Sequence, residues 1–211
     1  MTNLSTLLTL ADSRLPTGGH VHSGGVEEAI TSGVVVDLAT LRAYLRRRIR
    51  AHGLVTASLA AAVHAGTLSI VDADHETDAR TPAPAARQAS RAQGRGLARL
   101  ARRVWPDHDW HQLGTTPHLA VAAGAVGAAS GLNPDQTALS IVYTTMTGSA
   151  TAAQRLLALD PADVAALTFE LAPLCEAIAA EAGKELADLS DPLLDVLAQR
   201  HSERERPLFV S

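Results

Sequence analysis

The apolar positions of this chain recur at three- and four-residue intervals over much of its length. Between residues 38 and 49, leucine or isoleucine stands at positions 38, 41, 45 and 49, while arginine occupies 42, 46, 47, 48 and 50. This spacing gathers the apolar side chains on one face of an α-helix and the charges on the other. Asp37, directly before the pattern, can cap the helix start. The segment therefore predicts an amphipathic helix.

Similar patterns and their flanking residues predict most of the remaining helices. We expect a leucine-rich helix before the turn at Pro16, and a helix after Ser23 as N-cap with Glu27 and Glu28 in its first turn. Others are expected at about 54–65, closed by Gly66, at about 84–104, and at about 118–131. Asn133-Pro134, Asp160-Pro161 and Asp191-Pro192 each pair a capping residue with proline at the first helical position. "VDADHETDARTPAP" predicts a partly ordered connection and "WPDHDWHQLGTTP" a loop.

Composition favours an all-α class. Hydrophobic residues make up 46% of the 211 residues and aromatics only 3%, so the strand-favouring aromatics are scarce. We expect nine or ten helices in one domain, residues 1–203. A flexible C-terminal tail, residues 204–211, is expected outside the packed domain because Pro207 breaks the helix. The chain shows no secretion signal and no apolar run long enough to span a bilayer, which predicts a cytoplasmic protein.

Charge is unevenly distributed along the chain. The net charge is −4, which argues against a general nucleic-acid binder, but residues 1–105 carry +5 and residues 106–211 carry −9. The sharpest pattern is a row of arginines at every fourth position: Arg87, Arg91, Arg95, Arg99 and Arg103. This stripe is either a solvated helix face or a docking face for carboxylates, and the absence of interleaved aromatics disfavours nucleic acid.

No pattern in the chain predicts a catalytic or cofactor site. His20 and His22 could bind nickel or zinc, but no third ligand follows at a metal-motif spacing. His108, His111 and His118 form a second loose group with no better spacing. The glycine-rich stretch lacks the phosphate-binding G-x-x-x-x-G-K-[ST] pattern, and the single cysteine, Cys175, excludes an internal disulfide and a cysteine metal cluster. We predict that the chain is not an enzyme.

The stretch "LLTLADSRLPTGGHVHSGGVEEAI" resembles the N-terminal signature of the UreF family of urease accessory proteins. The matching positions are Leu15, Pro16, Gly18, Gly19, Ser23, Gly25 and Glu27, while His20 and His22 replace the usual aromatics. "SRAQGRGLARL" is similar to the family's basic helix, which contains Arg91 and Arg95. "YTTMTGSATAAQRLLALDP" is similar to a later helix pair and places Arg155 at a usually basic position. "DPLLDVLAQRHSERERPLFVS" resembles the family's C-terminus, with Arg200, His201, Leu208, Phe209 and Ser211.

This resemblance implies an all-α homodimer that acts as a scaffold in urease maturation. It would contact the UreD/UreH protein, the GTPase UreG and the urease apoprotein, and it would influence GTP-dependent nickel delivery. The residues implied in partner binding are those matched by the motifs: Pro16, Gly18, Gly19, Ser23, Gly25, Glu27, Arg91, Arg95, Arg155, Arg200, His201, Leu208 and Phe209. Two alternatives stay open: a nickel metallochaperone that uses His20 and His22, and a nucleic-acid-binding protein that uses the arginine stripe.

Overall fold

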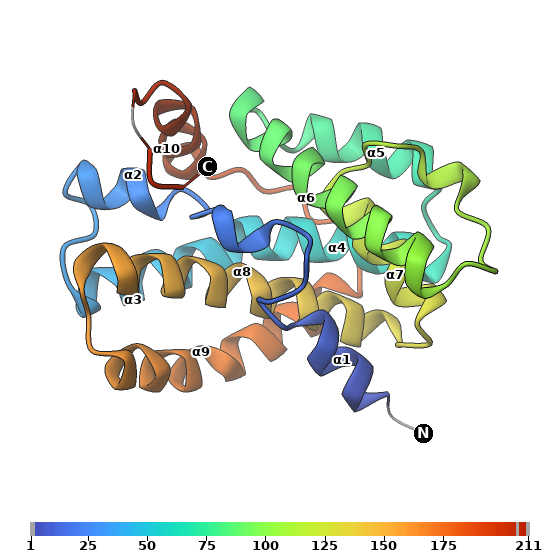
Figure 1. Cartoon of the computed structure of the whole chain (residues 1–211), viewed down its shortest axis with the longest axis horizontal. Helices are drawn as coiled ribbons and strands as arrows, with labels where there is room; N and C mark the ends of the chain where they lie inside the picture. Colours follow the sequence, from blue (N-terminus) through green and yellow to red (C-terminus); the bar gives the residue numbers. More distant parts are fainter. Residues whose placement is uncertain (1–2, 206, 210–211) are drawn as a thin grey trace.

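Ten α-helices form the framework of the computed structural model, which describes residues 3–205 and 207–209 (Figure 1). Within those residues no strand occurs, so the predicted all-α class is confirmed. The helices are α1 (Leu4–Leu10), α2 (Val26–Thr31), α3 (Leu38–Arg48), α4 (Leu54–Ala65), α5 (Ile70–Ala79), α6 (Pro84–Val104), α7 (Leu119–Ala129), α8 (Pro134–Leu157), α9 (Pro161–Ala182) and α10 (Pro192–Ser202). Short turns of 3-10 helix, Gly19–Val21 and His111–Leu113, and a π-helical turn, Ile49–Gly53, lie between them.

The centre of the bundle is built from α4, α7 and α8. α4 packs against both of the others, α6 covers α7, and α9 covers α8. Small residues let the backbones approach closely: a Cβ added at Gly124 of α7 would lie only 2.5 Å from the carbonyl oxygen of Ala60 in α4. The prediction of a central helix rich in small residues is therefore confirmed.

The predicted capping residues begin the helices as expected. The Asn133 side chain accepts a hydrogen bond from Gln136 N at 2.8 Å, and the Asp160 carboxylate accepts one from Ala162 N at 2.8 Å. Asp191 likewise accepts from Leu193 N at 3.1 Å. Each bond satisfies an amide that has no partner within its own helix, and the following proline has no amide to satisfy. These starts are set by local chemistry.

The structure corrects two local expectations. Most of the polar stretch predicted to be a connection is α5, which Ser69 caps by accepting a hydrogen bond from Asp72 N at 3.1 Å. The helix shows only a weak apolar pattern in the sequence, because its buried residues are Ala73 and Thr77 alone. The N-cap of α2 is Gly25 rather than Ser23, although Ser23 Oγ still accepts from Glu27 N at 3.4 Å.

The expectation that the tail lies outside the packed domain is wrong for its described residues. Phe209 is partly buried against the main hydrophobic core, and Arg204 reaches α2. Figure 1 shows α10 and the chain end lying beside α2, although the two are far apart in the sequence. Ser211, part of the C-terminal resemblance, lies outside the described residues. None of the helices described is both long and apolar enough to cross a membrane.

Candidate partner-binding site

A buried carboxylate on α2 fixes the C-terminal segment. Glu27 is 3% exposed and accepts three hydrogen bonds from residues more than 170 positions away. Leu208 N donates to Oε1 at 2.8 Å, and Phe209 N donates to Oε2 at 3.0 Å. The Nε2 of buried His201 donates to Oε2 at 2.8 Å. The N-terminal motif and the C-terminal tail therefore meet at one side chain.

The charge of Glu27 is stabilised by these donors. Burial on its own would raise the pKa of Glu27, but the hydrogen bonds from Leu208 N, His201 and Phe209 N outweigh burial, so that the pKa lies below its usual value. A buried carboxylate without such donors would be strongly destabilising. The tail amides and His201 thus satisfy the acceptor capacity of Glu27.

A second contact holds the same segment. Arg204 Nη1 donates to Glu28 Oε2 at 3.1 Å and to Thr31 Oγ1 at 2.7 Å. We call the set Glu27, Glu28, His201, Arg204, Leu208 and Phe209 the α2–tail platform. Its two apolar side chains differ: Phe209 packs against the core, whereas Leu208 is 80% exposed. The platform therefore presents an apolar side chain to solvent from an anchored backbone.

The glycine-rich signature positions α2. Gly24 and Gly25 have φ angles of 65° and 85°, which side-chain-bearing residues rarely adopt. Tyr44 Oη donates to Gly24 O at 2.8 Å, and Ser149 Oγ donates to Ser23 O at 3.1 Å. The loop is therefore tied to α3 and α8, and Glu27 follows it at a fixed place.

The earlier part of the signature lies against a different helix. A Cβ added at Gly96 of α6 would lie 2.5 Å from Thr17 O, so this turn packs on α6. Pro16 is exposed, Gly18 has a φ of 81°, and Gly19 begins a 3-10 turn. None of the three is among the contacts of the α2–tail platform.

The arginine stripe divides into two parts. Arg91 Nη2 lies 2.8 Å from carboxylate oxygens of both Asp74 and Asp78 on α5, and Arg91 Nη1 donates to Thr116 O at 2.9 Å. Arg91 is therefore neither solvated nor free to dock a partner's carboxylates, because the segment predicted to be a connection supplies its carboxylate partners. Arg95, Arg99 and Arg103 are exposed. Arg155 on α8 and Arg200 on α10 are exposed as well.

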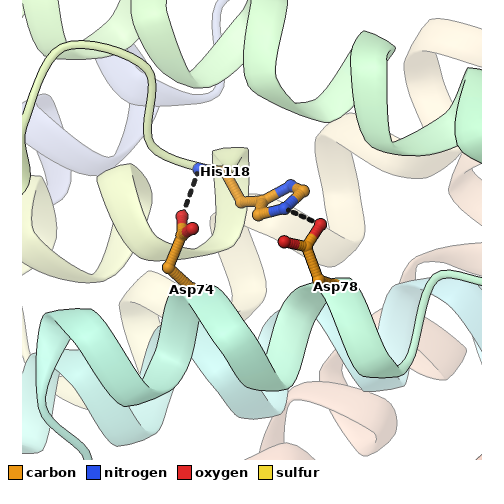
Figure 2. Close-up of side chains that lie close together, drawn as sticks. All are labelled: Asp74, Asp78 and His118. Atoms are coloured by element: carbon orange, nitrogen blue, oxygen red, sulfur yellow. Dashed lines mark hydrogen bonds and ion pairs between the residues drawn. The ribbon is translucent and has the colours of Figure 1, made fainter.

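Asp74, Asp78 and His118 form the one grouping of three metal-ligand side chains found in the described part of the chain (Figure 2). His118 Nε2 donates to Asp78 at 2.9 Å, while its backbone N donates to Asp74 at 3.2 Å. Burial lowers the pKa of His118 despite the Asp78 hydrogen bond, which favours a neutral ring. The Arg91 guanidinium bridges both carboxylates, and Arg87 Nε lies 3.8 Å from Asp78, so two cations balance the two carboxylates. This geometry is that of a structural clamp between α5, α6 and the start of α7.

The other histidines do not form a ligand set in the described residues. His20 is exposed and His22 is partly buried, and neither belongs to a described group of three ligand side chains with donor atoms within 4.8 Å of one another. His108 and His111 are exposed, unlike buried His118, and His108 instead contacts the Trp110 ring at a centroid distance of 4.4 Å. The grouping of these three histidines is therefore not found.

Comparison with known proteins matches residues 35–172 to the UreF family model. The chain belongs to the UreF family. It is 79% identical to the urease accessory protein UreF of Mycobacterium sp. (strain JLS) and 72% identical to that of Mycobacterium tuberculosis (strain ATCC 25618 / H37Rv), over the full length of each chain. It is also 78% identical to the urease accessory protein UreF of Mycolicibacterium vanbaalenii, again over both full lengths. The resemblance inferred from the motifs is confirmed.

In this UreF-family chain, the sequence did not indicate several residues of the α2–tail platform and of the clamp around His118. Glu28 and Arg204 carry opposite charges but lie too far apart in sequence to be paired without the fold. Asp74 and Asp78 lie one helical turn apart, a spacing that would have placed them on one face had α5 been recognised. The missing signal was thus the helix itself, not the charged residues.

Proposed function

We propose that this chain is a non-enzymatic scaffold in the maturation of urease. In this proposal it bridges the UreD/UreH protein and the GTPase UreG in the cytoplasm, and it modulates GTP-dependent delivery of nickel to the urease apoprotein. The observation that carries the proposal is the α2–tail platform, where the N-terminal signature and the C-terminal end meet at Glu27. The family membership supports the same conclusion.

The UreD/UreH contact is assigned to the tail end of the platform. Leu208 is 80% exposed, yet the backbone on both sides of its side chain is held by Glu27. An exposed leucine on an anchored backbone loses little further conformational entropy when a partner covers it. Burying this side chain supplies about 2 kcal/mol of binding free energy.

The protein is also proposed to be a homodimer, with the exposed arginines of α6 contributing to self-association or to UreG binding. Arg95 and Arg99 are not held in ion pairs of the kind that engage Arg91. The acidic second half of the chain, with a net charge of −9, offers a complementary surface.

The nickel-metallochaperone alternative has less support. In the described residues His20 and His22 do not belong to any group of three ligand side chains whose donor atoms lie within 4.8 Å of one another, and a stable site needs three or four ligands. Equilibrium dialysis of nickel against the unchanged protein and the His20→Ala/His22→Ala variant separates the two functions.

The tail assignment is tested by pull-down of UreD/UreH with the full-length protein and two single variants. Leu208→Ala should weaken capture by about tenfold or more, because most of the side chain's apolar surface is available to the partner. Leu8→Ala is the matched control, since Leu8 on α1 is a leucine of similar exposure, 71%. Deletion of residues 204–211 should abolish capture. Because it also removes two hydrogen-bond donors of Glu27, helical circular dichroism and urea unfolding of this variant are measured first, and capture is scored where the variant is folded.

Equal capture by the Leu208→Ala and Leu8→Ala variants would contradict the assignment of the tail. Capture by the deletion variant would show that the partner uses another surface. Urease activation measured with the same variants then reports whether the weakened contact matters for maturation.

A further inference from the structure

Arg48 lies where α3 passes into the π-helical turn Ile49–Gly53, and it lines a cavity of the described structure. The cavity has a volume of about 600 Å³ and is bounded by the glycine-rich loop, α4, α8 and α10. π-Helical turns are rare and occur frequently at functional sites. The backbone at this point therefore departs from a regular helix beside a space large enough for a ligand.

Arg48 has no carboxylate partner among the described residues. Its Nε is buried without a hydrogen-bond acceptor, and the one side chain that interacts favourably with it is the Tyr44 hydroxyl. The guanidinium lies close against the loop, because a Cβ added at Gly24 would be 2.6 Å from Nη2. The neighbouring Arg47, in contrast, lies 2.5 Å from the Asp191 carboxylate.

An uncompensated cation in such a place is costly. Removing a charged group from water is unfavourable by several kcal/mol unless an opposite charge or a full set of hydrogen bonds replaces the water. Burial does lower the pKa of Arg48, yet a guanidinium does not lose its proton under ordinary conditions. Arg48, which is partly buried, thus keeps a positive charge that no described carboxylate balances.

The surroundings of Arg48 include a further donor. His52, one turn along the chain, lines the cavity, whereas the α8 hydroxyls of Thr144 and Ser149 already donate to Ser140 O and Ser23 O. His52 is exposed at its outer side but lines the cavity, where desolvation and the Arg48 cation lower the pKa of its ring and favour the neutral form.

Most of the remaining charged groups of the lining have partners of their own. Asp12 pairs with Arg14, Asp191 pairs with Arg47, and Arg80 pairs with Glu76. Asp195 accepts a hydrogen bond from the backbone of Ala83 but forms no salt bridge among the described residues. The described lining therefore keeps two cations outside salt bridges, Arg48 and exposed Arg155, against one such carboxylate, so positive charge is in excess.

We propose that the cavity binds a small oxyanion, a carboxylate or an inorganic phosphate, through the Arg48 guanidinium with the His52 ring beside it. Guanidinium groups bind both anions by charge-assisted hydrogen bonds. The anion neutralises the cation beneath the glycine-rich loop. The site shares no residue with the α2–tail platform apart from Phe209, which borders the cavity, so it stands independently of the proposed function.

The test measures thermal unfolding of the full-length protein as chloride is replaced, at constant ionic strength, by sodium formate or by sodium phosphate. The unchanged protein should show a saturable rise in Tm with at least one of the two oxyanions, since a ligand that binds the native state stabilises it. The formate and phosphate arms distinguish a carboxylate from a phosphate. Isothermal titration with the same salts gives the affinity directly.

Two substitutions locate the site. Arg48→Gln should abolish the saturable response, and Arg48→Lys, which keeps the charge but loses the planar donor group, should weaken binding about tenfold. Arg46→Gln is the matched control, because Arg46 is an exposed arginine of the same helix, and its response should equal that of the unchanged protein. If Arg48→Gln does not fold, the unchanged protein and Arg48→Lys still decide the question.

The proposal is overturned if the unchanged protein responds to neither oxyanion beyond chloride, or if the Arg48 variants respond as it does. A response lost equally in Arg46→Gln would also overturn it, because the effect would then be a general one of surface charge.

Discussion

At the scale of single residues, Glu27 links α2 to the C-terminal tail. It accepts hydrogen bonds from two tail amides and from His201, and it is itself almost completely buried. Glu28, beside it, accepts a hydrogen bond from the Arg204 side chain. These neighbouring glutamates provide a matched pair for measurement.

Glu27→Gln should lower the free energy of unfolding by about 2 kcal/mol. The amide keeps one carbonyl acceptor but places an NH₂ donor where an N–H already points, so at least one bond is lost. Glu28→Gln should cost about 1 kcal/mol or less, because it weakens one partly exposed contact. Urea unfolding at neutral pH measures both. Equal effects would show that the tail amides contribute nothing through Glu27.

The stability difference between the unchanged protein and Glu27→Gln should depend on pH. The pKa of Glu27 is lower in the folded protein than its ordinary value of 4.5, so its charge stabilises the fold fully above that value. The contribution is lost as the pH falls from there through the folded pKa. Urea unfolding across this range should show a constant difference above pH 4.5 and a shrinking one below it. A difference that grew on acidification would contradict the argument.

At the scale of helices, the close contact of α6 with the start of α7 requires a glycine at position 94. A Cβ added at Gly94 would lie 2.1 Å from Pro117 O and 2.7 Å from the carbonyl carbon of His118. Both are backbone atoms, so no rotamer change relieves the overlap. The same region carries the clamp that joins Arg91 to Asp74 and Asp78.

Gly94→Ala should therefore destabilise the protein by about 3 kcal/mol, because the two helices must separate. Gly148→Ala is the control: Gly148 lies within α8 and has no atom within 4 Å of an added Cβ. There, alanine should be neutral or stabilising by up to about 1 kcal/mol through its higher helix propensity. Thermal or urea unfolding compares the two, and a Gly94→Ala variant as stable as Gly148→Ala would disprove the close contact.

At the scale of the whole molecule, charge segregation is partly neutralised within the fold. Arg91 binds α5, and Arg42 and Arg47 pair with Glu170 and Asp191 from the acidic half. Arg95 and Arg99 remain exposed on α6. Arg91 is already held by α5, so an interface that uses the stripe must use these exposed members. A test should leave Arg91 unchanged, because reversing its charge would disrupt the internal clamp.

The double variant Arg95→Glu/Arg99→Glu should weaken either self-association or partner capture, with the larger effect at low salt. Exposed charges are screened beyond about 8 Å at physiological ionic strength, so an electrostatic contact weakens as salt is added. Arg46→Glu/Arg50→Glu makes the same change in net charge at two other exposed arginines. Light scattering and pull-down at low and high salt measure the two processes. If both double variants behave like the unchanged protein, the exposed arginines form only a solvated face.

Local signals in the sequence were sufficient for most of the fold. The basic helix was predicted at about 84–104 and lies at Pro84–Val104, because its capping proline and periodic apolar positions act within a few residues. Of the site, the motifs indicated Glu27, His201 and Phe209 individually. Their meeting at one carboxylate could not be predicted, since hydrogen bonds across more than 170 residues leave no local pattern.

The sequence by itself determined the helical class, the capped helix starts and the family, because propensity, capping and motif identity are properties of short segments. Tertiary structure alone decided that residues 70–79 are helical, that the described tail residues lie on α2, and that Arg91 is neutralised while Arg48 is not. The physical reason is the same in each case. A weakly apolar segment, a buried charge or a chain end gains its stability from partners that only the folded chain brings within contact distance.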